Sequence, residues 1–463
     1  MVASPAPAAA QPAASESGAG PLLMIERISV EGNTKTSSHL IERVIGVEAG
    51  DVMRAGDPRL VSAEFNVLAM GFFREVAVRL EKGSQRDRVV LVIAVKERGT
   101  IILERLFFGT TQVTPWWAGL DVTERNFAGT GFAVGGGFVV AGEGDAEGAD
   151  SQRAFQLRIT DTSLLGTRVG WFAAAHYLDA SEPFRVRGDP SDGAAENFAA
   201  FDYSRTGAQG GVNLAVSGLS TLTLGLRAER VEAVLPDAPT RELEDGTVRA
   251  VNLGLLPGGS RVVTGSIAFD RDTRNDPVLT GTGDRLQLRG ELGASWLGGQ
   301  YDYGTAFARY QRWWEVGSPS HVMSVHLTGG VVIADAPRFD QLHVGDLNRM
   351  VSPRAMGLVV SSTPSLDLLG TATEDVTYGE VGGLAEVQYS YRLFRDRFKL
   401  YGGDVFFGVG LWSLAQTRDL RVRDESIYRA LPIDLLVDIG LRLDTEIGIF
   451  ELSLANALGR VPL

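Results

Sequence analysis

Residues 221–230 read TLTLGLRAER, and apolar and polar side chains alternate along them. One side of such a strand would carry Leu222, Leu224, Leu226 and Ala228. The other side would carry Thr223, Gly225, Arg227 and Glu229. The same period of two recurs in residues 285–292 (RLQLRGEL) and 433–444 (IDLLVDIGLRLD). The pattern predicts long β-strands with one apolar and one polar face.

From residue 105 onward the chain shows no long helical pattern and divides into segments separated by Gly, Asp, Asn and Pro. Soluble sandwiches and propellers prefer strands of about 5–6 residues, and we find no propeller repeat of about 40–50 residues. Strands of about ten or more residues with charges at alternate positions suit a tilted crossing of a bilayer. Because lipid cannot pair with backbone groups, such a sheet must close. We therefore predict a mainly β protein whose residues 99–463 form a transmembrane antiparallel barrel of about 14–16 strands.

The candidate strands are 105–112, 116–126, 131–142, 151–163, 167–180, 200–217, 220–233, 260–271, 284–295, 302–316, 321–334, 378–393, 399–413, 431–444 and 447–458. Single-chain bacterial barrels usually have an even number of strands, so one strand is missed, false or absent from the C-terminal end. The short links 296–301 and 444–448 are expected to be periplasmic turns. The longest gaps, 181–199, 235–259 and 336–377, are expected to be external loops.

The bulk composition excludes several other classes of protein. The 463 residues hold 44 Lys and Arg against 57 Asp and Glu, a net charge of -13, which argues against nucleic acid as a partner. With no cysteine, neither a disulfide nor a thiolate metal site can form. Of the five histidines only His321 and His326 are close, and five residues apart they face opposite sides of a strand. We expect no metal and no cofactor.

The segment before the barrel predicts a small α/β domain in residues 22–98, after an Ala/Pro/Ser-rich linker in residues 1–21 that we expect to be disordered and that lacks a secretion signal. Residues 24–33, 75–80 and 88–97 read as strands, and 37–47 and 57–70 have helical spacing, in the order β-α-α-β-β. The buried stripe of the second helix is predicted to be Leu60, Val61, Phe65, Leu68 and Ala69.

This order resembles a POTRA domain, the periplasmic module of the BamA-type outer-membrane superfamily of surface antigens, assembly factors and two-partner transporters. The residues that carry the resemblance are Gly32, Asn33, Gly71 and Phe73, in the Val-Glu-Gly-Asn turn at 30–33 and the Gly-Phe-Phe junction at 71–73. The resemblance implies an exposed sheet edge that binds extended chains by β-augmentation. The alternatives are an unrelated α+β domain, and an edge that only braces the barrel.

The barrel segment resembles the same superfamily in three further places. Residues 126–131 (NFAGTG) match its N-x-x-G-x-G turn, residues 269–286 its D-x-R-D-x-P…T-x-G-x-x-L turn, and residues 378–392 the segment after its long sixth loop. The motif residues in the two turns are Asn126, Gly129, Gly131, Asp270, Arg274, Asp276 and Gly283.

The chain also departs from the family pattern. The family's sixth loop carries a Val-Arg-Gly-aromatic motif whose arginine reaches carboxylates on later strands. Here Arg354, and less closely Arg349, are the candidates for this arginine, but Ala355 and Met356 replace the glycine and the aromatic residue. Ser390 and Gly408 stand where acidic residues are expected. The remaining candidate partners are Asp404, Asp434 and Asp438, which could equally be solvated charges of the lumen. The resemblance also makes residues 448–458 the penultimate strand, which would leave an unpaired edge.

The leading hypothesis is an outer-membrane protein of a Gram-negative bacterium that handles, inserts or translocates polypeptide by β-augmentation at POTRA and barrel edges, without catalysis. Its surroundings would be outer-membrane lipid and lipopolysaccharide, and its partners a polypeptide substrate or another outer-membrane or periplasmic subunit. One alternative is a non-catalytic scaffold or partner subunit. Another is a diffusion pore or a barrel-borne lipid hydrolase, for which His176 or His326 would have to meet a serine on the lipid face.

Overall fold

The structure is a computed structural model that describes residues 21–111, 113–161, 168–188, 192–243, 245–276, 278–347, 354–360, 378–397, 400–417, 433–445 and 448–460. The chain forms two compact units. The first consists of residues up to 100 together with 126–131, and the second of 101–125 together with the chain from 132 onward.

The first unit is a four-stranded mixed sheet covered by two helices. Its elements are β1 (Leu23–Glu31), α1 (Ser38–Val44), β2 (Val52–Met53), α2 (Pro58–Ala69), β3 (Phe73–Lys82) and β4 (Arg88–Glu97). The sheet order is β2-β1-β4-β3, with β1 parallel to β4 and β3 antiparallel to it. The predicted β-α-α-β-β order is confirmed, with the two-residue strand β2 as an addition. The core includes Ile25, Ile41, Leu91 and Ile93.

The predicted buried face of α2 is right for Leu60 and wrong for Val61, Phe65 and Leu68, and the side chain of Ala69 lies outside the described part of the chain. Ala63 and Val67 are fully buried, with Leu60 packed beside them, whereas Val61 and Phe65 are 73% and 70% exposed. Both sets of residues fit a helical period, so the pattern alone did not distinguish them. Against the sheet, the smaller Ala63 allows close approach of the helix, and the bulkier apolar residues remain outside.

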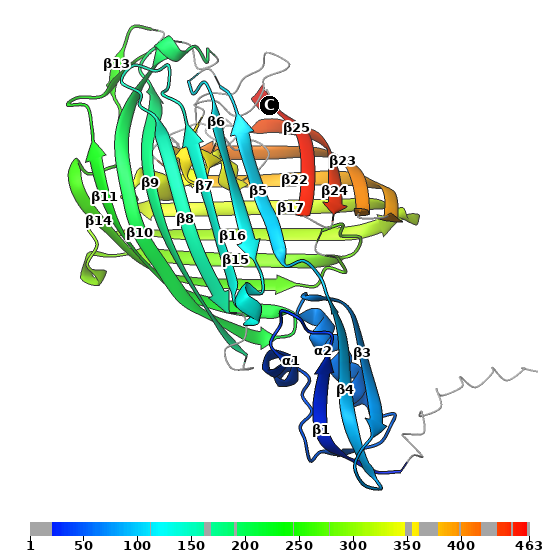
Figure 1. Cartoon of the computed structure of the whole chain (residues 1–463). Coiled ribbons are helices and arrows are strands. Elements are labelled where there is room, and N and C mark those ends of the chain that lie inside the picture. Colours follow the sequence, from blue (N-terminus) through cyan, green and yellow to red (C-terminus); the bar gives the residue numbers. More distant parts are fainter. Residues whose placement is uncertain are drawn as a thin grey trace, which may run out of the picture. The chain divides into compact units, whose positions relative to one another are not determined.

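The second unit is a fifteen-stranded antiparallel sheet that curls into a nearly closed barrel (Figure 1). Its strands are β5 (Ile101–Gly109), β6 (Trp117–Glu124), β7 (Ala133–Ala141), β8 (Gln152–Asp161), β9 (Val169–Arg185), β10 (Phe198–Ser217), β11 (Ser220–Val234), β14 (Gly258–Asp272), β15 (Gly283–Gly293), β16 (Tyr303–Val316), β17 (Ser318–Ala334), β22 (Val381–Arg397), β23 (Leu400–Ala415), β24 (Asp434–Thr445) and β25 (Gly448–Arg460). Each pairs with its neighbour along the chain, in the order β5 to β25. The predicted barrel is confirmed, and every candidate strand corresponds to one of these fifteen.

The connections alternate between two rims of the barrel. One rim carries short turns, such as the single residue Gly317 between β16 and β17. The other rim carries the long connections 186–197, 235–257 and 335–380, the last of which we call the sixth loop. The link 294–302 lies on this long-loop rim, because it joins β15 to β16. The expectation that residues 296–301 form a turn on the short-turn rim was therefore wrong, since the alternation of strands, and not the length of a link, decides its side.

The period of two divides each strand between an outer and a lumen face, as residues 221–230 predicted. Leu226, on the outer face, is 66% exposed, whereas Glu229, on the lumen face, is 4% exposed. None of the helices in the described ranges has the length and apolar character of a membrane span.

Candidate functional site

The lumen of the barrel is filled near the long-loop rim by the sixth loop, which contains the turn Arg338–Asp340, β18 (Leu342–His343), α3 (Val344–Leu347), β19 (Arg354–Ala355), β20 (Leu358–Val359) and β21 (Tyr378–Gly379). Phe339, Leu342 and Leu358 are buried in the same core as barrel residues such as Leu178 and Val231. The described parts of the loop are therefore packed as part of the barrel interior.

One anchor of the sixth loop is Arg338, which donates from Nε to the Glu182 carboxylate on β9. Glu182 also accepts hydrogen bonds from the hydroxyls of Tyr203 (3.1 Å) and Tyr378 (3.3 Å). The Arg338 guanidinium lies 4.6 Å from the centre of the Tyr378 ring. Glu182 is only 1% exposed. These partners therefore balance its charge and satisfy its oxygens inside the protein.

A second anchor surrounds Asp340. Arg227 on β11 donates from Nη2 to Asp340 Oδ2 (2.5 Å) and to Glu291 Oε1 (2.7 Å), and from Nη1 to Glu229 Oε1 (3.0 Å). The hydroxyl of Tyr303 on β16 also donates to Asp340. Arg227 thereby joins the loop to strands β11, β15 and β16 by charge-assisted hydrogen bonds.

The hairpin of β19 and β20 packs against the wall formed by β8 and β9. Gln152 Nε2 on β8 lies 3.4 Å from the carbonyl oxygen of Val359, and Thr111 Oγ1 donates to the carbonyl oxygen of Val360 at 2.8 Å. Arg354 lies in this region, with its Nη1 4.0 Å from Asp346 Oδ1 and its guanidinium 5.7 Å from the Tyr378 ring centre.

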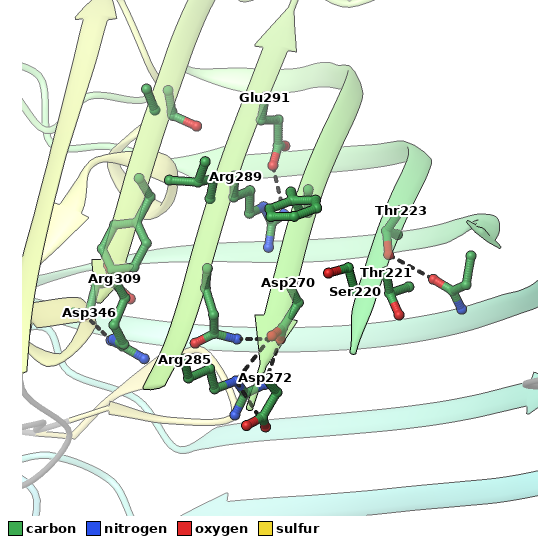
Figure 2. A pocket seen from close by; sticks show the side chains of 18 of the residues that line it. Ser220, Thr221, Thr223, Asp270, Asp272, Arg285, Arg289, Glu291, Arg309 and Asp346 are labelled. Atoms are coloured by element: carbon green, nitrogen blue, oxygen red, sulfur yellow. Dashed lines mark hydrogen bonds and ion pairs between the residues drawn. The ribbon is translucent and has the colours of Figure 1, made fainter. Parts of the chain in front are cut away.

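Below the sixth loop, toward the short-turn rim, the lumen contains a cavity of about 1000 Å³. Figure 2 shows charged side chains of both signs around it, among them Asp270, Arg285, Glu291 and Arg309. Asp340, Asp346 and Arg354 of the sixth loop line the cavity as well. Charged and apolar side chains both line this cavity, and the described part of the sixth loop forms one side of it.

The carboxylates predicted to bind the loop arginine lie on the opposite wall, on β23 and β24. Asp404 pairs with Arg442 at 3.6 Å, and Asp438 is 1% exposed. Neither oxygen of Asp438 forms a hydrogen bond with the residues that the structure describes. Asp434 is buried at the long-loop end of β24. Arg354 contacts Asp346 and Tyr378, Asp404 is paired with Arg442, and the other candidate, Arg349, lies outside the described residues.

Gly408, which stands where the family pattern has an acidic residue, lies beside Asp438. A Cβ on Gly408 would lie 1.8 Å from Asp438 Oδ1 and 2.8 Å from Glu386 Oε1. The carboxylate of Asp438 therefore occupies the space that a side chain at position 408 would fill. An acidic group is still present at this point of the lumen wall, but it comes from the neighbouring strand.

The predicted turn after β14 is held together by its motif residues. Asp270 accepts from Arg285 Nη2 at 2.6 Å, Arg274 pairs with Asp272 at 2.6 Å, and Asp276 Oδ1 accepts from the backbone amide of Val278 at 2.8 Å. Gly283 follows where β15 begins. This turn also reaches another wall of the barrel, because Arg392 Nη2 on β22 donates to the carbonyl oxygen of Leu279 at 2.6 Å. Residue 277 of the motif lies outside the described residues.

The other predicted turn, Asn126–Gly131, belongs to the first compact unit. Asn126 donates from Nδ2 to Thr36 Oγ1 at 2.8 Å and accepts from the amide of Gly131 at 2.9 Å. A Cβ on Gly129 would lie 1.8 Å from the carbonyl oxygen of Lys35. The side chain of Asn126 thus holds the turn by hydrogen bonds, and the close approach of Lys35 leaves no space for a side chain at Gly129.

Gly32 and Asn33 shape the turn between β1 and α1. Gly32 has φ +86°, and a Cβ there would be 2.1 Å from the carbonyl oxygen of Val95. Asn33 Nδ2 donates to the carbonyl oxygen of Thr36 at 2.8 Å. At the other motif position, Gly71 (φ +77°) ends the α2 region and Phe73 is buried at the start of β3.

The same turn binds the carboxylate of Glu97, at the end of β4. Glu97 accepts from Thr34 Oγ1 (2.6 Å) and from the backbone amides of Thr36 (2.6 Å) and Lys35 (3.0 Å). Partial burial by itself would raise the pKa of Glu97, but the hydrogen bonds from Thr34, Thr36 and Lys35 outweigh it and lower the pKa from 4.5 to about 2. The sequence showed Glu97 only as a strand end.

The two histidines considered for a lipid hydrolase both face the lumen. His176 Nε2 lies 3.4 Å from Glu229 Oε1, and His326 Nδ1 lies 3.9 Å from Glu386 Oε2. Neither histidine can therefore meet a serine on the lipid face. The residues that hold the sixth loop, Glu182, Arg227, Arg338 and Asp340, were not predicted as a site. The only local signal was the pair Arg227 and Glu229 on the polar face of residues 221–230.

Comparisons with known proteins agree with both units. Residues 126–461 match the Omp85 superfamily domain, and residues 23–98 match a POTRA family described as a surface antigen variable number repeat. The outer membrane protein assembly factor BamA of Nitratidesulfovibrio vulgaris is 23% identical over 343 residues, which are 71% of this chain. The match spans only 38% of that relative.

Two solved structures share the fold. BamA from Haemophilus ducreyi lacking POTRA domains 1–3 has a TM-score of 0.61 at 14% identity, covering 95% of this chain and 82% of that one. CdiB from Escherichia coli has a TM-score of 0.57 at 11% identity, covering 98% and 90%. At these identities the likeness concerns the fold alone.

Proposed function

Since this chain belongs to the Omp85 superfamily, we propose that it inserts or translocates polypeptide at the outer membrane by adding strands of its substrate to free edges of its own sheets. The observation that carries this proposal is the seam of the barrel. The end strands β5 and β25 approach each other (Figure 1), yet no pairing joins them in the part of the chain that the structure describes.

An end strand without a partner presents a row of free backbone donors and acceptors, which is a template for another strand. Apolar side chains on both end strands are exposed, with Phe108 on β5 and Leu452 on β25 at 73% and 75%. An incoming amphipathic strand can pair with this backbone and place its apolar face in the lipid. The seam thus provides for β-augmentation.

The second edge is β3 of the POTRA-like domain, which we take to span residues 22–98 and to lie in the periplasm. β3 pairs with β4 on one side only and is ten residues long. Its apolar side chains Val76, Val78 and Leu80 alternate with exposed residues. An extended segment of a substrate, or of a partner subunit, can therefore add to this edge before it reaches the barrel.

The packed sixth loop argues against a simple diffusion pore. Its two anchors, at Glu182 and Asp340, bind it to three strands of the lumen wall, β9, β11 and β16. Translocation through the lumen would require these anchors to open, whereas insertion at the seam would not. We therefore favour insertion at the seam over passage through the lumen.

A photo-crosslinking amino acid at Phe108 or Leu452 tests the proposal, with unfolded outer-membrane barrel polypeptide added to the purified chain in lipid vesicles. We expect adducts from both end strands and none from Leu226, which is similarly exposed but lies on the interior strand β11. A crosslinker at Ala77 on β3 should capture the same polypeptide, and one at Lys96 on the central strand β4 should not. Equal capture at Leu226 and Phe108 would refute selective pairing at the seam.

One observation favours a second candidate function, a non-catalytic scaffold or partner subunit. Ala355 and Met356 stand where the family's loop motif has a glycine and an aromatic residue, and Arg354 beside them contacts Asp346 and Tyr378 of the loop itself, so the family's motif is altered. A scaffold would retain the edges without processing substrate. It would copurify with a stable partner and would give no seam adducts with unfolded polypeptide.

A further inference from the structure

The outer face of the barrel has a hollow of about 630 Å³ that extends from β11 to β17, away from the seam. Its floor is made of small residues on three adjacent strands: Gly290, Ala306, Ala308 and Gly329. Register places Ala306 opposite Gly290 and Val331, and Ala308 opposite Leu288 and Gly329, so all of them share one face. Leu288 and Leu292 on this face are 43% and 50% exposed, whereas Glu291 on the alternate face binds Arg227 in the lumen, so this shared face is the one that meets lipid. We call it the outer groove.

The protein's own packing does not require glycine in the outer groove. A Cβ on Gly329 would meet only the carbonyl oxygen of Gly382, at 3.8 Å, and one on Gly290 would meet Ile267 Cγ2 at 3.7 Å. Both are ordinary van der Waals distances, and neither glycine has a positive φ. By contrast, a Cβ on Gly440 would lie 2.3 Å from the Phe406 ring. Larger side chains are therefore sterically allowed in the groove, yet it remains hollow.

A basic residue lies at the short-turn end of the outer groove. Arg312 is on the same face of β16 as Ala308, and four residues of strand separate them by about 13 Å. Arg312 is exposed and forms no ion pair or hydrogen bond within the described ranges of the chain. Its register neighbour Asp284 is already paired with Arg271 at 3.1 Å. The rim at this point therefore carries a net positive charge facing the membrane surface.

We propose that the outer groove binds a phospholipid, with one acyl chain in the hollow and the phosphate on Arg312. Charge complementarity selects this occupant, since a hydrocarbon chain joined to an anion matches an apolar hollow that leads to an unpaired guanidinium. In the orientation of the proposed function, with short turns in the periplasm, the lipid belongs to the inner leaflet. The choice of leaflet rests on the orientation in the proposed function, whereas the groove and its lipid do not depend on it.

Native mass spectrometry of the full-length chain in detergent, with added phosphatidylglycerol as the probe, tests the site. Ala308→Leu fills the floor, and we expect the population with one bound lipid to fall at least about fivefold. Ala228→Leu is the matched control, because Ala228 also faces outward but lies outside the groove. It should change lipid binding less than about twofold. The heat-dependent gel migration of a folded barrel shows that each variant is folded.

A second arm tests the headgroup. Arg312→Gln should lower phosphatidylglycerol binding about fivefold and leave diacylglycerol, which lacks the phosphate, unchanged. Equal losses for Ala308→Leu and Ala228→Leu would mean that lipid coats the barrel without a site. A disulfide-linked dimer formed through Ala306→Cys, in a chain without other cysteines, would show that a second copy occupies the groove. Each of these two results would overturn the proposal.

Discussion

Two facing regions of the lumen differ in the number of partners that they provide for a buried carboxylate. On the wall of β9, Glu182 accepts hydrogen bonds from one arginine and from two tyrosine hydroxyls. On the wall of β23 and β24, Asp438 is as deeply buried but forms no hydrogen bond within the described chain. A buried charge stabilises a structure only when it is matched by partners. The difference indicates that the buried carboxylate of the first wall holds the sixth loop through an ion pair, whereas Asp438 makes no contact of this kind with the residues that the structure describes.

The largest loss of stability is expected when the partnered carboxylate of Glu182 is removed. Glu182→Ala leaves Arg338 buried without its anion and removes the acceptor of Tyr203 and Tyr378, which should cost about 3–5 kcal/mol. Urea unfolding in lipid vesicles measures the loss, and protease cleavage within residues 335–360 should increase. Ion conductance of single barrels should rise as the loop leaves the lumen. Asp438→Ala on the opposite wall is the control, and an equal effect of that variant would contradict the comparison.

Restoring the family's acidic residue should also destabilise the barrel. In Gly408→Asp the new side chain would collide with the Asp438 carboxylate, and the cost of overpacking and of adjacent like charges should be about 2–4 kcal/mol. The double variant Gly408→Asp/Asp438→Gly should recover most of the loss. Urea midpoints of the two single variants and the double variant check this. Additive losses would show that the two positions do not share one space.

The period of two was sufficient to predict the barrel, because each strand pairs with its neighbour along the chain and its lumen face alternates locally. The site was not predictable in the same way. Glu182 and Arg338 are separated by 156 positions, and Arg227 and Asp340 by 113. Such pairs depend on how a long loop folds back into the lumen, on which local periodicity has no bearing. The exposed face of α2 was missed for a related reason, since two apolar stripes compete and only contact with the sheet selects one.

A smaller effect is expected at Glu97, a well-partnered carboxylate near the surface. Its folded pKa of about 2 lies below the unfolded value of 4.5, so its contribution is fully present above about pH 4.5 and is lost as the pH falls toward 2. Glu97→Gln should cost about 1–2 kcal/mol at pH 7, since solvent screens part of the interaction. Hydrogen exchange of residues 88–97 in the full chain measures this. The wild-type and variant rates should approach each other as the pH falls to about 2, and a constant difference across pH would contradict the assignment.

The smallest effect is expected at Glu75, which pairs with Lys96 one residue away from Glu97 in the same sheet. Their side chains are 72% and 64% exposed, and the pair is 3.2 Å long. An exposed ion pair of this kind contributes about 0–0.5 kcal/mol, so Glu75→Gln should leave the exchange of residues 88–97 almost unchanged between pH 3 and 7. Both substitutions remove one negative charge from the domain. We expect the loss of stability to decrease from Glu182 to Glu97 to Glu75, following the number of hydrogen-bond donors around each carboxylate. A loss of stability at Glu75 as large as that at Glu97 would therefore mean that net charge, and not the number of donors, determines the effect.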